Sequence, residues 1–260
     1  MGQEISTEQI QQQMRSLSLA ESAQCLPELL QDASKESWSY NRFLYRLMGY
    51  EQKRRDEKQV ERRLKWAAFP FHHTLEAFRL DEQQSLSRTQ MNQLQTLNWI
   101  DQLYNLILLG PPGVGKTHLA VGLGIQAIEQ GYRVMFVSMG ELIHLLKTEG
   151  ISRKSQIRLK RIRDANLVIL DDLMFMAMNA SEANLFFHLI NDLYDHTAIV
   201  LTSNKAPTAW GELLGDPAIT TAILDRLIHR AEIIHLNGDS YRMKHRTSIF
   251  GKQESKSVQT

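Results

Sequence analysis

The sequence predicts an α/β fold, with a parallel sheet covered by helices. Two observations lead to it. From residue 105 onward, short apolar runs alternate with helical stretches, and a complete phosphate-binding loop joins the first run to the helix that follows it. Strands separated by helical stretches are typical of parallel sheets, because a parallel crossover needs room for a helix. The predicted strands are residues 105–109, 133–138, 167–170, 198–202 and 232–236.

The N-terminal part has a different pattern, which is helical throughout. Ser6 and Gln9 form a capping box that begins a first helix. A second helix is expected over residues 19–33, with Pro27 as a boundary or kink. A third helix is expected to be interrupted at Gly49. The side of this helix that faces the core is predicted to carry Phe43, Leu44, Leu47 and Met48. We therefore expect a helical domain over residues 1–66, a second domain over residues 67–250 and a disordered tail over residues 251–260.

Composition excludes several classes of protein. With 260 residues, of which 43% are hydrophobic and 23% charged, the chain is not a wholly disordered one. The single cysteine, Cys25, can neither pair within the chain nor build a cysteine zinc site, which fits a reducing, cytoplasmic location. No apolar run approaches the roughly 20 residues of a membrane helix, so no membrane partner is expected. Because the net charge is only +1, any binding to nucleic acid has to come from clustered charge.

The phosphate-binding loop is the strongest motif in the sequence. Residues 110–117, GPPGVGKT, match the pattern G-x-x-x-x-G-K-T between a predicted strand and a predicted helix over 118–130. Backbone N–H groups of such a loop surround a phosphate at the positive end of the helix. Lys116 is expected to contact the β- and γ-phosphates of ATP, and the Thr117 hydroxyl to bind Mg²⁺. The predicted nucleotide-binding residues are Gly110, Pro111, Pro112, Gly113, Val114, Gly115, Lys116, Thr117 and His118.

Two further strands end in polar residues that suit hydrolysis. The strand over 167–170 is followed by Asp171, a predicted Mg²⁺ ligand, and by Asp172, predicted to polarise the attacking water. The alternative for this acidic pair is a helix cap or a turn. Asn204 follows the strand over 198–202 and is predicted to orient the same water, although Ser-Asn after a strand is by itself more typical of a turn.

Arg226 and Arg230 are four residues apart on a predicted helix. Either could complete the nucleotide site of a neighbouring subunit, which would require an oligomer; the alternative is a face of intrahelical ion pairs. We favour Arg226.

From Gly110 to Arg246 the sequence resembles the AAA+ ATPases of the DnaC-like helicase-loader branch, and most closely the IstB family of transposition helper ATPases. The segments that carry the resemblance are SEANLFFHLINDLY (181–194), LTSNKAPTAWGELLGDP (201–217), AILDRLIHRAEIIHL (222–236) and GDSYRMK (238–244), with a looser likeness in WAAFPFHHTLEAF (66–78). The sequence departs from many AAA+ proteins at Asp172, where they carry Glu, and at Met174, where relatives often have Gly.

The resemblance implies an AAA+ core and Mg²⁺-dependent hydrolysis of ATP. The stretch after Asn204 is short for the helical lid of most AAA+ proteins, so we expect a short C-terminal lid. It implies that Arg226 is the arginine finger and that Arg242 has the sensor 2 role. It also implies ATP-dependent homo-oligomers on double-stranded DNA that help an IstA-type transposase to select and use its target. Phe69, Pro70 and Phe78 would approach the adenine, unless they only pack in the core.

Two basic clusters are the candidate DNA-binding residues. The first lies in a stretch without any acid, and a cluster of this kind would bind phosphates independently of sequence. The second forms a stripe on the third N-terminal helix, where Glu57 and Glu61 flank it, so that an ion-paired surface is an equal alternative. The predicted residues are Arg153, Lys154, Arg158, Lys160 and Arg161 in the first cluster and Arg54, Lys58 and Arg62 in the second.

Two other functions remain open at the level of the sequence. One is a DnaC-like loader of a replicative helicase, which would prefer single-stranded DNA. The other is a nucleotide-gated DNA scaffold with little hydrolysis, for which Asp172 is the only support.

Overall fold

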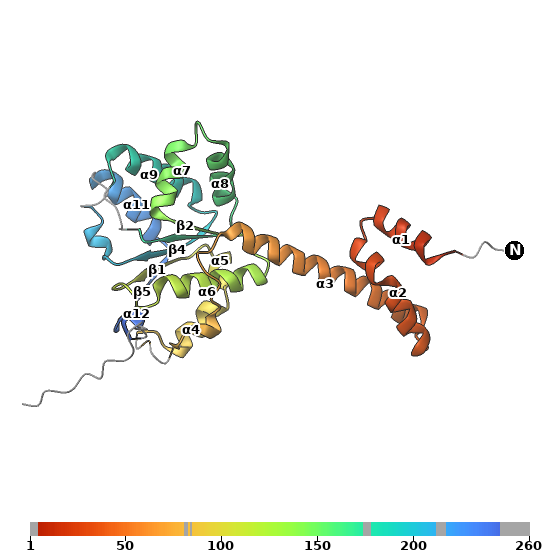
Figure 1. Cartoon of the computed structure of the whole chain (residues 1–260). Coiled ribbons are helices and arrows are strands. Elements are labelled where there is room, and N and C mark those ends of the chain that lie inside the picture. The colour runs from red at the N-terminus through yellow and green to blue at the C-terminus, as the bar shows by residue number, and fades with distance from the viewer. Residues whose placement is uncertain (1–4, 81–82, 84, 174–177, 212–216, 245–260) are drawn as a thin grey trace, which may run out of the picture. The chain divides into compact units, whose positions relative to one another are not determined.

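The computed structural model describes residues 5–80, 83, 85–173, 178–211 and 217–244, without the side chains of Arg242 and Lys244 (Figure 1). The chain divides into two compact units, Met1–Arg63 and Leu64–Thr260. The expected tail over 251–260 lies outside the described residues. Among those described, no helix combines the length and the apolar character that crossing a membrane requires.

The second unit contains a parallel sheet of five strands, in the order β2-β3-β4-β1-β5. This confirms the predicted α/β class and all five predicted strands, with ends that differ by at most one residue. The strands are β1 (Asn105–Leu109), β2 (Val134–Ser138), β3 (Leu167–Asp171), β4 (Ala198–Ser203) and β5 (Ala231–His235). Because β3, β4 and β1 are neighbours and all parallel, their carboxyl ends meet at one edge of the sheet.

Helices cover both faces of this sheet. Figure 1 shows α7, α8, α9 and α11 on one face and α6 with α4 on the other. The larger core lies on the first side, where Phe186 and Trp210 are fully buried. The helices of the unit are η1 (Leu75–Ala77), α4 (Arg88–Gln95), α5 (Asn98–Asp101), α6 (Lys116–Glu129), α7 (Met139–Thr148), α8 (Arg153–Arg163), α9 (Ala180–Leu193), η3 (Pro207–Ala209), α11 (Pro217–Ile228) and α12 (Tyr241–Lys244).

The first unit is helical, as its sequence pattern predicts, and contains α1 (Thr7–Ser16), α2 (Ala20–Lys35) and most of α3 (Tyr40–Ala67). Ser6 and Gln9 form the predicted capping box. Of the two alternatives predicted for Pro27, the boundary is wrong, since α2 continues through it, and the kink stays a prediction. Proline lacks the N–H that would reach the carbonyl four residues earlier. That carbonyl, on Ala23, instead accepts a hydrogen bond from Gln11 Nε2 at 2.7 Å.

Two predictions for the third helix are also wrong. Helix α3 continues through Gly49 without an interruption. Of the predicted stripe only Leu47 is buried and Phe43 partly buried, whereas Leu44 and Met48 are 51% and 53% exposed. The small core of the unit therefore uses a narrower face of α3 than the pattern suggests. Polar contacts complete it, because the buried Glu51 accepts a hydrogen bond from the Ser22 backbone N–H of α2 at 2.7 Å.

Candidate nucleotide-binding site

The phosphate-binding loop connects β1 to α6 at the carboxyl edge of the sheet. Gly113 and Gly115 have φ angles of 86° and 98°, which favour glycine. A Cβ on Gly113 would also lie 2.1 Å from Ser240 Oγ, so this glycine is needed for space as well. The Tyr241 N–H donates to the Gly113 carbonyl at 3.0 Å. The first residue of α12 and the serine before it thus contact the loop.

Lys116 begins α6 and is buried. Its ammonium group donates to the carbonyl of Gly110 at 2.7 Å and to that of Pro111 at 2.9 Å. These contacts hold the cation against the loop whose N–H groups are predicted to surround a phosphate. Lys116 also lines the cleft described below.

Thr117 and Asp171, the two predicted Mg²⁺ ligands, lie side by side. Thr117 Oγ1 donates to Asp171 Oδ1 at 2.8 Å, and Thr202 Oγ1 of β4 donates to the same oxygen at 2.7 Å. Burial raises the pKa of Asp171, and these two hydrogen bonds oppose that rise. A hydroxyl and a carboxylate are the hard oxygen donors that Mg²⁺ prefers, with phosphate oxygens completing its shell. The described residues contain no group of three or more His, Cys, Asp or Glu that could hold a metal ion by itself, so a Mg²⁺ ion at Thr117 and Asp171 would depend on the phosphates for further ligands.

Sequence reasoning missed Thr202. Its hydroxyl oxygen also accepts a hydrogen bond from the backbone N–H of Asp172 at 2.9 Å, so one threonine fixes both acidic residues. Asp172 is exposed and has a φ of 55°, a left-handed conformation that is strained for a residue with a side chain. The signal in the sequence was a threonine near the carboxyl end of an apolar strand, which by itself is common in strands.

A cleft of about 790 Å³ runs along this edge of the sheet. Its size lies within the range of small-molecule sites. It brings together Lys116, Thr117, Asp172 and Asn204, four of the predicted site residues. The P-loop from Pro112 onward, His118 and the acidic Asp239 also line it.

Aromatic rings line another part of this cleft. The His118 imidazole lies among Phe71, His73 and Phe78, with ring centroids 5.2 to 6.2 Å away. Burial lowers the pKa of His118. Of the residues expected to approach the adenine, Phe78 lines the cleft, whereas Phe69 packs against Phe136.

The predicted finger arginine lies away from the cleft of its own chain. Arg226 Nε donates to Asn191 Oδ1 at 3.2 Å, and its guanidinium lies 4.9 Å from the centroid of the Phe187 ring; both residues belong to α9. Arg230 is exposed. Arg242 belongs to α12, but its side chain lies outside the described part of the chain, so its predicted role stays a prediction.

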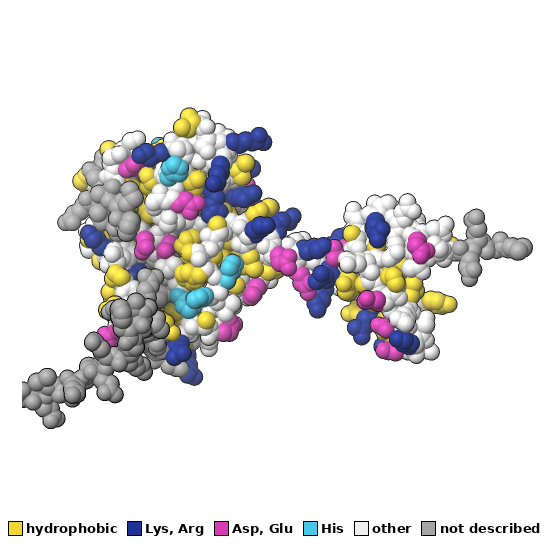
Figure 2. Space-filling model, in the orientation of Figure 1, with side chains coloured by type: hydrophobic (Ala, Val, Ile, Leu, Met, Phe, Trp, Pro, Cys, Tyr) yellow, Lys and Arg dark blue, Asp and Glu magenta, His cyan; other side chains and the backbone are white. Residues whose placement is uncertain are grey.

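The basic residues of α8 do not form one uniform surface. Figure 2 shows Lys and Arg side chains gathered over the region of α8. Arg158, however, is directed inward: it donates to the carbonyls of Trp66 and Phe136 at 2.9 and 2.6 Å, and burial lowers its pKa. It thus ties α8 to β2 and to the end of α3.

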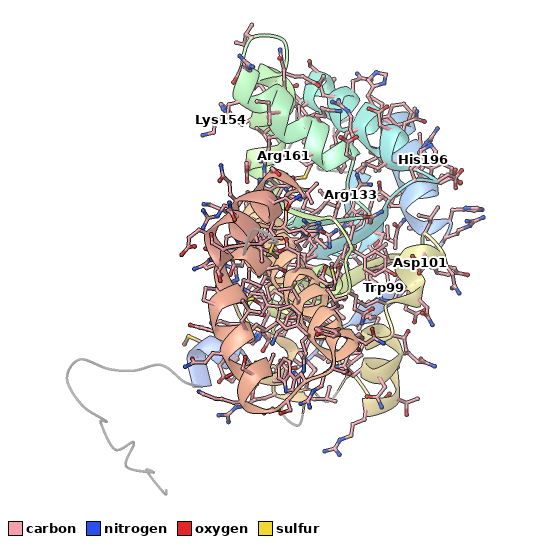
Figure 3. All side chains as sticks on the ribbon, turned by 90° about the vertical axis from the view of Figure 1, so that its right-hand side faces the viewer. Trp99, Asp101, Arg133, Lys154, Arg161 and His196 are labelled. Carbon is pink, nitrogen blue, oxygen red and sulfur yellow. The ribbon has the colours of Figure 1, made fainter. Side chains whose placement is uncertain are left out.

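The other members of this cluster differ in exposure. Lys160 is paired with Asp164 at 3.3 Å, and the Arg161 guanidinium lies 4.7 Å from the Trp66 ring centroid. Figure 3 shows Arg161 and Lys154 on the same side of α8. In the part of the chain that the structure describes, Arg153 and Lys154 are exposed and have no ion-pair partner.

The basic stripe on α3 is paired with acids of the same unit. Arg54 pairs with Glu57 at 2.6 Å and with Glu21 at 3.8 Å, and Lys58 also pairs with Glu21. Arg62 is exposed and has an interaction of its own. The structure therefore favours the ion-paired surface over a DNA-binding face at these positions.

Comparisons with known proteins agree with this geometry. A family model described as IstB-like ATP binding protein matches residues 12–249. An insertion sequence IS21 ATP-binding protein of Pseudomonas aeruginosa is 40% identical over 216 residues, which cover 83% of this chain and 82% of that protein. An IS21-like ATP-binding protein of Bacteroides fragilis is 36% identical over 241 residues, 93% of this chain and 92% of that one.

The fold also has solved counterparts. The AMPPCP-bound DnaA of Aquifex aeolicus has a TM-score of 0.52 and 22% identity, over 68% of this chain and 54% of that chain. At that identity the likeness concerns the fold, which is the AAA+ P-loop fold, as predicted. The matches of the family model and of the insertion-sequence proteins extend over most of the sequence. The chain belongs to the family of IstB-like ATP-binding proteins.

Proposed function

We propose that this protein is a Mg²⁺-dependent ATPase that assembles on double-stranded DNA and assists the IstA-type transposase of an insertion sequence. The observation that carries the proposal is the cluster of Thr117, Asp171 and Thr202 beside a cleft that also contains Lys116 and Asp172. Phosphoryl transfer needs a cation and a metal site at the phosphates, and a group that activates water. The cleft contains the residue types for each.

Each side chain has a separate part in the proposed reaction. Lys116 neutralises charge on the β- and γ-phosphates, and Thr117 and Asp171 would hold Mg²⁺, which would supply positive charge against the charge that develops on the phosphates. Asp172 polarises the attacking water, and Asn204 orients it. Because Asp172 and Asn204 both line the cleft, they can act on the same water.

Arg226 belongs to the neighbouring subunit's site in this proposal. Its side chain is held on α9 and not in its own cleft, which supports an action on another copy of the chain. The site would then be complete only in an oligomer. This makes hydrolysis depend on assembly.

DNA binding in this proposal rests on α8. The exposed Arg153 and Lys154 and the partly exposed Arg161 supply charge for phosphates, whereas Lys160 is paired with Asp164 and Arg158 has a structural part. Contacts of this kind are independent of sequence and weaken steeply with salt. The relatives belong to insertion sequences, which is why a transposase is the proposed client.

The test is steady-state ATP hydrolysis at low salt, without DNA, with single-stranded DNA and with a duplex of random sequence. We expect the unaltered protein to hydrolyse ATP, and duplex DNA to stimulate hydrolysis more than single-stranded DNA does. Asp172→Asn should bind ATP without hydrolysing it. Lys116→Ala should lose ATP binding itself. Stimulation by single strands alone would favour the helicase loader. ATP binding without turnover under any condition would favour the nucleotide-gated scaffold.

A further inference from the structure

One ring nitrogen in the nucleotide cleft has no hydrogen-bond partner. Among the described side chains, His118 Nε2 is the only buried nitrogen or oxygen atom without one. Buried polar atoms almost always have partners, so an unpaired one in a cleft wall suggests that a ligand supplies the partner.

The chemistry of an imidazole nitrogen limits what this atom can bind. A ring nitrogen without a proton accepts a hydrogen bond, and one that carries a proton donates. His118 Nε2 does neither among the described residues. Because the exocyclic amino group of adenine is a donor, the unprotonated form of Nε2 is the one that would pair with it.

The rings around His118 indicate the kind of ligand. Phe71, His73 and Phe78 lie around the imidazole and line the cleft with it, as suits a flat aromatic base. The phosphate loop is adjacent, because a Cβ on Gly115 would lie 3.0 Å from Phe78 Cε2. His118 also directly follows the predicted Mg²⁺ ligand Thr117. A nucleotide with its phosphates on the loop could therefore place its base here.

We propose that His118 selects the base of the nucleotide, with Nε2 accepting a hydrogen bond from the exocyclic 6-amino group of adenine. This rests on the proposed binding of ATP in the cleft. Guanine and hypoxanthine carry an oxygen at the same position, which would face the Nε2 lone pair. A site that hydrogen-bonds one ligand group rejects analogues without it, because its own buried atom is then unpaired.

The test compares equilibrium binding of ATP, purine riboside triphosphate and inosine triphosphate, each with Mg²⁺, to the full chain. Purine riboside triphosphate lacks only the 6-amino group. One hydrogen bond corresponds to about a 3- to 10-fold change in affinity. We therefore expect about that loss for purine riboside triphosphate in the unaltered protein, and a larger one for inosine triphosphate.

Variants then assign the effect to His118. In His118→Phe, which keeps an aromatic ring without an acceptor, ATP and purine riboside triphosphate should bind equally. His118→Gln, whose amide oxygen can accept, should restore part of the preference. His72→Phe is the matched control, because His72 lies next to Phe69 and does not line the cleft. It should retain the full preference.

The outcomes separate the two proposals. If the unaltered protein binds ATP but does not distinguish it from purine riboside triphosphate, base selection by His118 is overturned and the ATP site stands. The same holds if His118→Phe keeps the full preference. If the unaltered protein binds neither nucleotide, the ATP site itself is wrong, and base selection with it.

Discussion

Thr202 Oγ1 donates a hydrogen bond to Asp171 Oδ1 at 2.7 Å and accepts one from the Asp172 backbone N–H at 2.9 Å. The hydroxyl on β4 therefore orients the predicted metal ligand and the predicted water-activating residue together. Because Thr202 is fully buried, no solvent molecule competes for these bonds. Removing a hydrogen-bond partner of a metal ligand usually lowers the affinity for the metal by about 10- to 100-fold.

Removing this hydroxyl should weaken Mg²⁺ binding. In Thr202→Val we expect the Mg²⁺ concentration for half-maximal ATPase activity to rise about 10-fold or more, while Thr202→Ser stays close to the unaltered protein. Magnesium titrations of hydrolysis measure this. Thr197→Val is the matched control, because Thr197 is equally buried just before β4 and its hydroxyl binds the Ala165 carbonyl instead. An equal rise in Thr197→Val would show a general effect of strand stability.

Loss of an exposed basic residue of α8 should affect DNA binding, whereas loss of the inward-directed Arg158 should affect stability. Lys154→Ala removes an exposed cation, so we expect weaker DNA binding, a salt dependence whose logarithmic slope falls by about 1, and unchanged melting. Arg158→Ala leaves the Trp66 and Phe136 carbonyls without this donor, so we expect a lower melting temperature. Binding to a random duplex between low and moderate salt, with thermal melting, separates them. A slope unchanged in Lys154→Ala would remove this end of α8 from the DNA surface.

Arg226 should act on a neighbouring subunit. Arg226→Ala is expected to lower hydrolysis about 1,000-fold and to leave ATP binding intact, since its side chain lies outside its own cleft. Mixing it with Lys116→Ala should restore part of the activity, because one variant supplies the intact P-loop and the other the intact arginine. Arg230→Ala is the control and should stay active. No recovery at any mixing ratio would argue against a finger acting between subunits.

How far the sequence predicts the structure depends on how local each feature is. The five strands and the P-loop follow from short patterns, and the structure places them as predicted. The partners of Asp171 depend on which strands are neighbours, and so Thr202, 31 residues away, carries no local signal. Arg158 and Lys154 lie in the same basic stretch of sequence, yet Arg158 donates a hydrogen bond to the carbonyl of Trp66, 92 residues away. Long-range contacts of this kind decide which of several similar side chains remain available for a ligand.

Acid should unfold the helical unit through Glu51. Burial alone would raise the pKa of this carboxylate, but hydrogen bonds from Ser22 and Arg55 outweigh it and lower the pKa below its usual value of 4.5. A lowered pKa contributes stability above the unfolded pKa, which is lost as the pH falls through the folded one. We therefore expect hydrogen-exchange protection of α2 and of the first half of α3 to be constant from pH 7 to 5 and to fall below about pH 4.5.

Variants assign this fall to Glu51. In Glu51→Gln the loss of the charged bonds should cost about 1–2 kcal/mol already at pH 7, and protection should depend less on pH. Glu61→Gln on the same helix alters an exposed carboxylate and should keep the fall of the unaltered protein. Exchange measured on the full chain gives both results, because peptides from α2 and from the first half of α3 report on this unit alone. If Glu51→Gln retained the same protection and the same fall, another carboxylate would have to explain the acid sensitivity.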